Sequence, residues 1–349
     1  MKRRPAQRKK KVITRPMRKV ILRVGIVFII FLISATFLGL YSLHKYVNHT
    51  YASALSTSSR PIVENRIPTI SYIVVENFRS DPLVLKKVNY IIFDKDTKKV
   101  LLYDLPVDNK YELPGKFGGE DLSKMFALGG LNSDNYLEAG VEIINRSITK
   151  LFGFKVDKYI LVSEEEQLFF DDLWTRGGVL NLIRVAKFIG SNSSFISNMN
   201  LKDLYGLVSF IDSLPRDRVI KDTSPLCYCN TQYFDDLIRE ATLESEIAQE
   251  KKDIAVLNGT NFSGLANFGA RLVRNLGGRV IAISNTERFY DNSFIVADDI
   301  NSQTVEVLSR VLRIDNIIMK SESHSFMENE IDRSDIVIIF GFDTSGDLY

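Results

Sequence analysis

The chain has 349 residues, which allows one large domain or two or three smaller ones. Hydrophobic residues make up 45% and charged residues 25%, as in an ordinary globular protein. The net charge of +2 hides an asymmetry, because the first 23 residues contain eleven Lys and Arg and no Asp or Glu. The rest of the chain is therefore net acidic, which excludes a generally basic body and requires a local explanation for the basic segment.

Residues 24–43 are predicted to form a transmembrane helix. They carry no charge and reach about the twenty residues that a helix needs to cross a bilayer. The basic segment 1–23 then stays in the cytoplasm by the positive-inside rule, and the body lies outside the cell membrane. A cleavable signal peptide is the alternative, since ASA at 52–54 offers a cleavage site, but its apolar region is usually only about 7–15 residues long. We expect an uncleaved single-pass anchor and no nucleic-acid partner, because a charge block beside such a segment is more often topological.

Residues 44–66 are polar and rich in Ser and Thr, so they are predicted to link the membrane to the body. Residues 67–240 predict an α/β sandwich around a central sheet. Its clearest elements are a strand at 69–76, a β-hairpin of strands at 88–94 and 99–105, a helix at 137–153 with Gly153 as its C-cap, a strand at 157–163 and a helix from 164. Later residues predict helices at 181–194 and 201–214, a polar loop at 215–223 and one long charged helix at 231–253.

Residues 253–349 predict a second, small α/β domain. The expected elements are a strand at 254–258, a helix at 263–276, a strand at 279–284, an apolar run at 293–297, a helix at 302–313 and a final strand at 335–343. The predicted fold class is therefore α/β, with an N-terminal transmembrane helix, an α/β sandwich domain and a small C-terminal α/β domain.

The second domain opens on Asn258-Gly259-Thr260, between a strand and a helix. A Rossmann loop needs G-x-G-x-x-G and a Walker A loop needs Gly-Lys-Ser/Thr, and neither pattern is present. We predict a structural turn in which Gly259 has a positive φ, Ser263 caps the helix and Gly264 permits close packing. No bound nucleotide and no cofactor are expected here.

Cys227 and Cys229 are two residues apart, which makes a disulfide between them strained. They are predicted to be ordinary buried thiols, with a redox pair as the alternative. The histidines, His44, His49 and His324, do not form a metal-binding pattern in the sequence.

The stretch VLNGTNFSGLA at 256–266, followed by LGGRVIAISN and the closing DIVIIFGFD, resembles the LytR C-terminal domain of bacterial cell-envelope proteins. The resemblance covers about residues 253–349. This domain frequently follows a LytR-CpsA-Psr catalytic domain, which the resemblance leads us to expect in residues 67–240.

Residues 98–115 resemble the strand of that catalytic family that runs into its I-P-R-D-T-x-x-x-I-P-G loop, and residues 137–163 resemble the helix and strand that come after it. Members of the family are membrane-anchored and transfer a phosphorylated glycopolymer from a polyprenyl-diphosphate carrier to a peptidoglycan sugar, using a divalent cation. The resemblance therefore implies Mg²⁺ if the chain is active. It also implies a cell-wall polymer or another envelope protein as partner.

The chain departs from the family loop at its central position. Val107 stands where the family has Arg, Asp108 matches the acidic residue and Asn109 replaces Thr. Arginine holds phosphate oxygens with two hydrogen bonds, and valine cannot replace it. Losing one such donor costs about 2–4 kcal/mol of transition-state stabilisation.

A second motif of the family, R-S-D-T, is also incomplete. Arg79-Ser80-Asp81 is either a displaced remnant or a chance match, and Arg216 lies in the wrong context to replace the missing arginine. Candidate catalytic residues are thus Asp108, Arg79 and Asp81, and replacement cations would have to come from Arg79, Lys86, Lys87 or Lys110.

The sequence leaves three functions open. The first is a binding or scaffold role in envelope polymer assembly, with a degenerate transferase-like domain. The second is an active phosphotransferase that attaches lipid-linked glycopolymer to peptidoglycan. The third, a membrane-tethered nucleotide-dependent enzyme, has the least support because the loop lacks the lysine and the second glycine.

Overall fold

The computed structural model describes residues 68–95, 98–113, 118–131, 135–175, 195–215, 219–222, 231–242 and 246–344, together with Thr36, Leu38, Gly39 and Tyr41. Most of the predicted transmembrane segment, the linker 44–66, the helix at 181–194, Arg216 and both cysteines lie outside these residues. In the part of the chain that is described, no helix is long and apolar enough to span a bilayer. Residues 1–49 and 50–349 are separate units, and both of the large sheets belong to the second unit.

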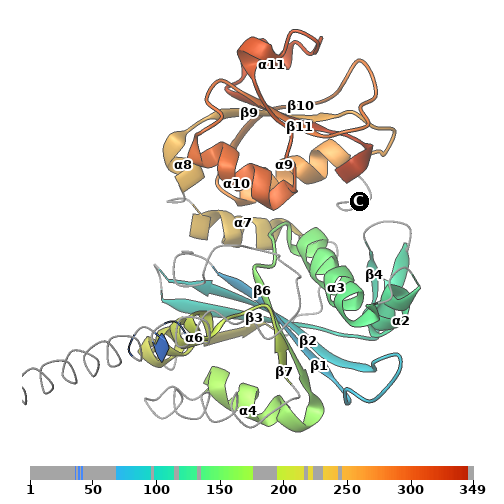
Figure 1. Ribbon diagram of the computed structural model, residues 1–349, viewed down its shortest axis with the longest axis vertical. Coiled ribbons are helices and arrows are strands. Elements are labelled where there is room, and N and C mark those ends of the chain that lie inside the picture. Colours follow the sequence, from blue (N-terminus) through green and yellow to red (C-terminus); the bar gives the residue numbers. More distant parts are fainter. Residues whose placement is uncertain are drawn as a thin grey trace, which may run out of the picture. The chain divides into compact units, whose positions relative to one another are not determined.

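The first sheet has six strands in the order β7-β6-β1-β2-β3-β8 (Figure 1). The strands are β1 (Thr69–Val75), β2 (Leu85–Asp94), β3 (Lys99–Leu105), β6 (Lys158–Ser163), β7 (Phe195–Ser197) and β8 (Val219–Asp222). β2 is antiparallel to both β1 and β3, while β6 is parallel to β1 and β8 is parallel to β3. The predicted hairpin is confirmed, because Asp94 pairs with Lys99 across its turn.

Helices cover both faces of the first sheet, and alternate residues of β2 point to opposite faces. Tyr90 and Ile92 belong to the apolar cluster that contains Ile144 of α3 (Tyr136–Phe152). Ile91 and Phe93 belong to the cluster that contains buried residues of α4 (Glu164–Thr175) and α6 (Leu201–Ser213). This arrangement accounts for the continuous apolar runs of the strands, which are buried on both sides.

Helix α3 ends at the predicted C-cap, and a side chain caps its start as well. The Asn135 side chain accepts a hydrogen bond from the Glu138 N–H, and Gly153 closes the helix with φ 62°. A side chain at Gly153 would have no space, since its Cβ would lie 2.7 Å from Arg271 Nε. Smaller elements come after β3, namely β4 (Lys110–Glu112), β5 (Gly119–Asp121), η2 (Leu122–Lys124) and α2 (Met125–Gly130).

Two predictions for residues 215–253 are wrong. The predicted polar loop at 215–223 contains β8, whose four residues extend the sheet beside β3. The predicted long helix at 231–253 is instead two helices, α7 (Thr231–Thr242) and α8 (Glu246–Glu250), and residue 253 already belongs to a strand. In the sequence, charged residues at helical spacing continue from α7 into α8 and beyond it, so no local pattern marks where either helix ends.

The second sheet has five strands in the order β10-β9-β13-β11-β12. They are β9 (Asp253–Asn258), β10 (Arg279–Asn285), β11 (Phe294–Ala297), β12 (Ile317–Met319) and β13 (Ile336–Phe340). The helical elements are α9 (Leu265–Asn275), α10 (Gln303–Leu312), η5 (Lys320–Glu322) and α11 (Glu330–Arg333). β10 and β13 are both parallel to the central β9, so these three strands end at the same edge of the sheet.

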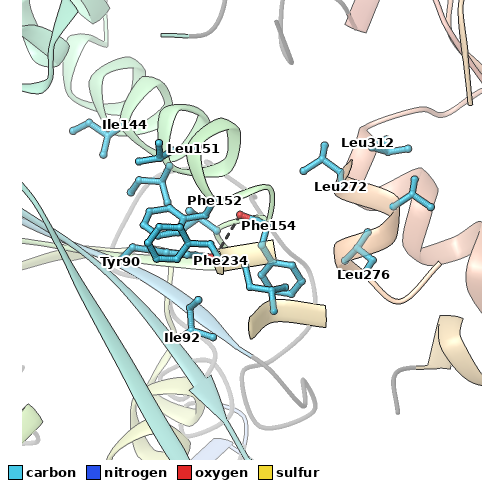
Figure 2. Packing of buried hydrophobic residues seen from close by; sticks show 14 of the residues in the cluster. Tyr90, Ile92, Ile144, Leu151, Phe152, Phe154, Phe234, Leu272, Leu276 and Leu312 are labelled. Atoms are coloured by element: carbon cyan, nitrogen blue, oxygen red, sulfur yellow. Dashed lines mark hydrogen bonds between the residues drawn. The ribbon is translucent and has the colours of Figure 1, made fainter. Parts of the chain in front are cut away.

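Helices α7 and α8 connect the two sheets through side chains. Phe234 of α7 packs on Phe152, with ring centroids 5.1 Å apart (Figure 2). It also packs on Tyr103, with ring centroids 4.9 Å apart, and thereby joins the aromatic core of the first sheet. Glu250 of α8 accepts hydrogen bonds of 3.0 Å from the backbone N–H groups of Gln303 and Thr304, at the start of α10. A carboxylate at this position satisfies free N–H groups of the first helical turn. The predicted division into domains 67–240 and 253–349 remains a prediction.

Candidate functional site

The candidate catalytic residues lie at one edge of the first sheet. β1 and β3 run in the same direction because both are antiparallel to β2, so the loops after Val75 and Leu105 leave the sheet at the same edge. Arg79 and Asp81 lie in the first loop and Asp108 in the second, and all three side chains are exposed. Ligands of open α/β sheets commonly bind at the carboxyl ends of strands, so the position suits a site.

The Arg79-Ser80-Asp81 loop is held by one carboxamide. Asn77 Oδ1 accepts hydrogen bonds from the backbone N–H groups of Arg79, at 2.8 Å, and Ser80, at 3.0 Å. This fixes the backbone of the loop while the Arg79 and Asp81 side chains remain at the surface.

The four cations proposed as replacements are not equivalent. Lys86 forms an ion pair with Glu76 at 3.6 Å, and Lys87 forms one with Asp171 at 3.3 Å. Arg79 and Lys110 are exposed. Exposed cations are screened by water and ions, so they stabilise developing charge much less than a cation fixed in a dry site.

Val107 is partly buried rather than exposed. Its side chain packs against the large apolar cluster to which both sheets contribute, and its carbonyl accepts a hydrogen bond of 3.0 Å from Ser123 N. Tyr111 further fixes the loop, since its hydroxyl donates to the Pro106 carbonyl at 3.1 Å. The position that holds arginine in the resembled family is therefore part of the packing here.

A magnesium ion in a phosphate site usually binds one or two carboxylates together with substrate oxygens. At this edge those carboxylates would be Asp108 and Asp81, both exposed. In the part of the chain that the structure describes, no three His, Cys, Asp or Glu side chains come together to hold a metal ion.

The Asn258-Gly259-Thr260 loop uses its polar groups internally. Asn258 Oδ1 accepts from Thr260 N at 3.0 Å and from Thr260 Oγ1 at 2.7 Å, while Asn258 Nδ2 donates to the Phe262 carbonyl at 2.8 Å. Thr260 Oγ1 in turn accepts from Phe262 N at 3.1 Å. The buried side chains of the motif therefore shape the loop.

The two glycines of the loop have the opposite roles to those predicted. Gly259 does not have a positive φ; it is required because a Cβ there would lie 2.7 Å from the Phe340 carbonyl oxygen. Gly264 has φ 88° and is itself the N-cap of α9. The predicted cap by Ser263 is also wrong, since no side chain caps this helix. Spacing alone could not distinguish a glycine chosen for its backbone angle from one chosen for lack of space.

A small basic cavity of about 80 Å³, which the sequence did not indicate, lies between α3 and α10. Its charged lining residues are Glu142, Arg146, Lys155, Arg310 and Arg313. Glu142 Oε1 lies 2.6 Å from Arg146 Nη2 and 3.0 Å from Arg313 Nη1. Burial acts to raise the pKa of Glu142, but the two guanidinium groups outweigh it and hold the pKa below its ordinary value.

We expect Glu142→Gln to lower the free energy of unfolding by about 1–2 kcal/mol at pH 7, because it replaces two charge-assisted hydrogen bonds. A carboxylate with a lowered folded-state pKa stabilises the protein above its ordinary pKa, and this stabilisation is lost as pH falls through the folded-state value. The difference between wild type and variant should thus shrink as pH falls below about 4.5. Urea unfolding at several pH values measures it. The more exposed Glu306→Gln is the control, and a Glu142→Gln effect independent of pH would contradict the assignment.

Sequence reasoning also missed a polar junction between α9, α7 and the end of α3. Arg271 Nε lies 2.9 Å from both carboxylate oxygens of Asp235. Its Nη1 donates to the Lys150 carbonyl and its Nη2 to the Leu151 carbonyl, both at 3.0 Å. Asn275 Nδ2 donates to the Gly153 carbonyl and to Asp235 Oδ1, both at 2.8 Å. Arg271 and Asn275 are four residues apart on one helix, and this spacing beside apolar residues was the available signal.

No protein-family model and no curated protein matches the chain. Among solved structures, B. subtilis TagV is 9% identical, with a TM-score of 0.39, over 51% of this chain and 98% of that one. TagT bound to LI-WTA is 13% identical, with a TM-score of 0.33, over 50% and 85%. The LytR-CPS2A-psr family protein YwtF (TagT) with bound octaprenyl pyrophosphate lipid is 12% identical, also with a TM-score of 0.33, over 50% and 85%. TM-scores below 0.5 assign no residue and no activity to this chain.

Proposed function

We propose that the chain is a membrane-anchored, extracytoplasmic protein of the bacterial cell envelope, with a binding or scaffold role in polymer assembly. The proposal rests on the resemblance of residues 88–163 to the LytR-CpsA-Psr family and of residues 253–349 to the LytR C-terminal domain. The uncharged run at 24–43 beside a basic segment supports the anchor and the outward-facing body.

The packing of Val107 is the observation that favours binding over catalysis. Phosphoryl transfer depends mainly on positioning and on fixed positive charge near the transferred group. At the position where the resembled family has arginine, this chain has a partly buried apolar side chain packed against the large apolar cluster. The cations nearby in the sequence are exposed or paired with carboxylates.

An active phosphotransferase, using Mg²⁺ to attach lipid-linked glycopolymer to peptidoglycan, is the alternative. The placement of Asp108, Arg79 and Asp81 in loops at one sheet edge favours it. In that case Asp108 would be the residue on which turnover depends, since it matches the acidic residue of the family loop.

The experiment compares the full-length wild type with Val107→Arg and Asp108→Ala in detergent or lipid vesicles containing lipid-linked glycopolymer and Mg²⁺. We expect the wild type to bind the polymer without transferring it. Val107→Arg should also be inactive and less stable by about 1–3 kcal/mol, because a charged side chain replaces packed apolar surface. Val107→Leu, which keeps the position apolar, is the control.

Two results would contradict this proposal. One is Mg²⁺-dependent turnover by the wild type that Asp108→Ala abolishes, which would establish the transferase. The other is turnover restored by Val107→Arg, which would show that the site lacks nothing except one cation. A wild type that neither binds nor transfers the polymer would exclude both roles.

A further inference from the structure

The cavity between α3 and α10 contains a buried donor that the described residues leave unused. Asn145 of α3 lines the cavity and is only 4% exposed. Its Oδ1 accepts a hydrogen bond of 2.6 Å from the Ser71 hydroxyl, whereas its Nδ2 donates to none of the residues that the structure describes. Nδ2 is open to the cavity rather than enclosed by protein. Buried amides are normally hydrogen-bonded, so this one indicates an acceptor inside the cavity.

Two cations of the lining also have spare donors. Arg310 has five N–H donors, its side chain is 18% exposed, and its one hydrogen bond within the described chain is a long contact of 3.4 Å with Glu306. The Lys155 side chain is equally enclosed, and of its three donors one is directed to Asp157, at 3.0 Å. Unused donors from α3, from the loop after it and from α10 therefore meet at one cavity.

The charge of the cavity selects the sign of a ligand. Its charged lining residues are four cations and one carboxylate, Glu142. Asp157 and Glu306 pair with two of these cations from outside the lining, and the cations still outnumber the carboxylates when both are included. Cations at the end of α10 also stabilise the helix dipole, which accounts for their sign but not for the spare donors. An anion satisfies the donors and the charge together.

The volume of the cavity limits the ligand to a small one. It is about 80 Å³, which is the space of two or three water molecules at about 30 Å³ each. One tetrahedral oxyanion fits such a space, whereas a sugar ring or a nucleotide is too large.

Glu142 distinguishes one oxyanion from another. Its Oε1 is held by Arg146 and Arg313, but its Oε2 accepts no hydrogen bond from the described part of the chain. A carboxylate oxygen repels an anion unless that anion has a proton to donate. Inorganic phosphate keeps at least one proton at neutral pH and sulfate keeps none. A phosphate monoester has lost most of its second proton at pH 7, because that pKa is about 6.

We propose that the cavity between α3 and α10 binds one inorganic phosphate ion. Asn145 and the cations donate to its oxygens, and its P–OH group donates to Glu142. The ion would join α3 to α10 in addition to the ion pair of Glu142 with Arg313. The inference does not rest on the proposed function, because neither Asp108 nor Val107 lines this cavity.

The test titrates the full-length protein in detergent with sodium phosphate by calorimetry, in a phosphate-free buffer at neutral pH. Half-saturation at or below low millimolar concentration is expected. Arg310→Gln should weaken binding about tenfold, because it removes charge-assisted hydrogen bonds. The matched control is Arg333→Gln, since Arg333 is an exposed arginine of α11 outside the cavity. Sodium sulfate and glycerol 3-phosphate, titrated at the same ionic strength, should each bind about tenfold more weakly than phosphate.

Glu142→Gln tests the selectivity independently of Arg310. It removes the negative charge that repels sulfate, and the glutamine amide can donate to an oxygen that has no proton. The variant should therefore bind sulfate and phosphate with nearly equal affinity. This comparison also decides the matter if Arg310→Gln does not fold.

Absence of phosphate binding to the wild type would overturn this inference, as would equal phosphate affinities of the wild type and Arg310→Gln. Sulfate bound as tightly as phosphate by the wild type would contradict the role of Glu142 and the choice of phosphate. Tighter binding of glycerol 3-phosphate would assign the cavity to the phosphate group of a larger molecule and thus overturn the assignment to the free ion. A preference for phosphate that persists unchanged in Glu142→Gln would also contradict it.

Discussion

Replacement of Arg271 by alanine is expected to lower the free energy of unfolding by about 3–5 kcal/mol, the usual cost of leaving a buried charge without its partner. The guanidinium group binds both oxygens of Asp235, whose side chain is 18% exposed, and it also caps the last carbonyls of α3 at Lys150 and Leu151. The variant leaves the two carbonyls without this donor, and it leaves the Asp235 carboxylate beside the Asn275 amide but without its charged partner. Urea unfolding of the full-length protein in detergent, at neutral pH, measures the loss.

Arg239→Ala supplies the comparison. Arg239 pairs with Asp236 on the same helix, but both side chains are largely exposed, so the change should cost less than about 1 kcal/mol. The double variant Arg271→Ala/Asp235→Ala should be less destabilised than the sum of the single variants, since it removes the stranded carboxylate as well. If Arg271→Ala and Arg239→Ala cost the same, the junction behaves as an exposed ion pair and the assignment is wrong.

Gly259→Val should lower the free energy of unfolding by about 3 kcal/mol or more, because backbone as well as side chains must move. A Cβ at this position would lie 2.7 Å from the Phe340 carbonyl oxygen and 2.9 Å from Tyr290 Cδ2. These contacts surround the hydrogen bonds that Gly259 makes with the Phe340 carbonyl and the Tyr290 N–H.

Thermal unfolding followed by circular dichroism measures the effect of Gly259→Val. Gly119→Ala is the matched control, since a Cβ at Gly119 meets nothing within 4 Å and Gly119 has no positive φ. Gly259→Ala should fall between the two, because the clash begins with the first carbon. An unfolding midpoint for Gly259→Val equal to that of Gly119→Ala would contradict the close approach of these loops.

Much of the fold was predictable because local signals and burial agree. The hairpin of β2 and β3 has β-branched and aromatic strands on either side of a short polar turn, and its register follows from that turn. Helix α3 combines an apolar face, an Asn cap and a terminal Gly153, so its C-terminal limit was predicted to the residue. In β9 and β13, a short apolar run followed by a glycine was sufficient to predict a strand.

The remaining features depend on contacts between distant residues. β8 consists of Val219–Asp222, four residues inside a largely polar stretch that pair in parallel with β3. The reason for Gly259 lies at Phe340, about eighty residues further along the chain, and the reason for Arg271 lies on α3 and α7. No local pattern encodes these pairings.

For the candidate catalytic residues, the sequence predicted the strand that precedes Asp108 but not the direction in which that strand runs in the sheet. The chemical departure at Val107 was visible from residue type alone, whereas the position of Asp108 at the same edge as Arg79 follows from the pairing of β1 and β3 with β2. That Val107 is partly buried became evident from the structure. Asn145 and Arg310 lie far apart in the chain, so their meeting at one cavity also became evident there.

The attachments of α9 also determine how the protein would bear a mechanical load. A force that pulls the second sheet away from the first meets Arg271 of α9, whose guanidinium group binds Asp235 on α7 and the carbonyls of Lys150 and Leu151 at the end of α3. One side chain thus holds two separate helices, so a pull across this junction loads several hydrogen bonds at once rather than a single one.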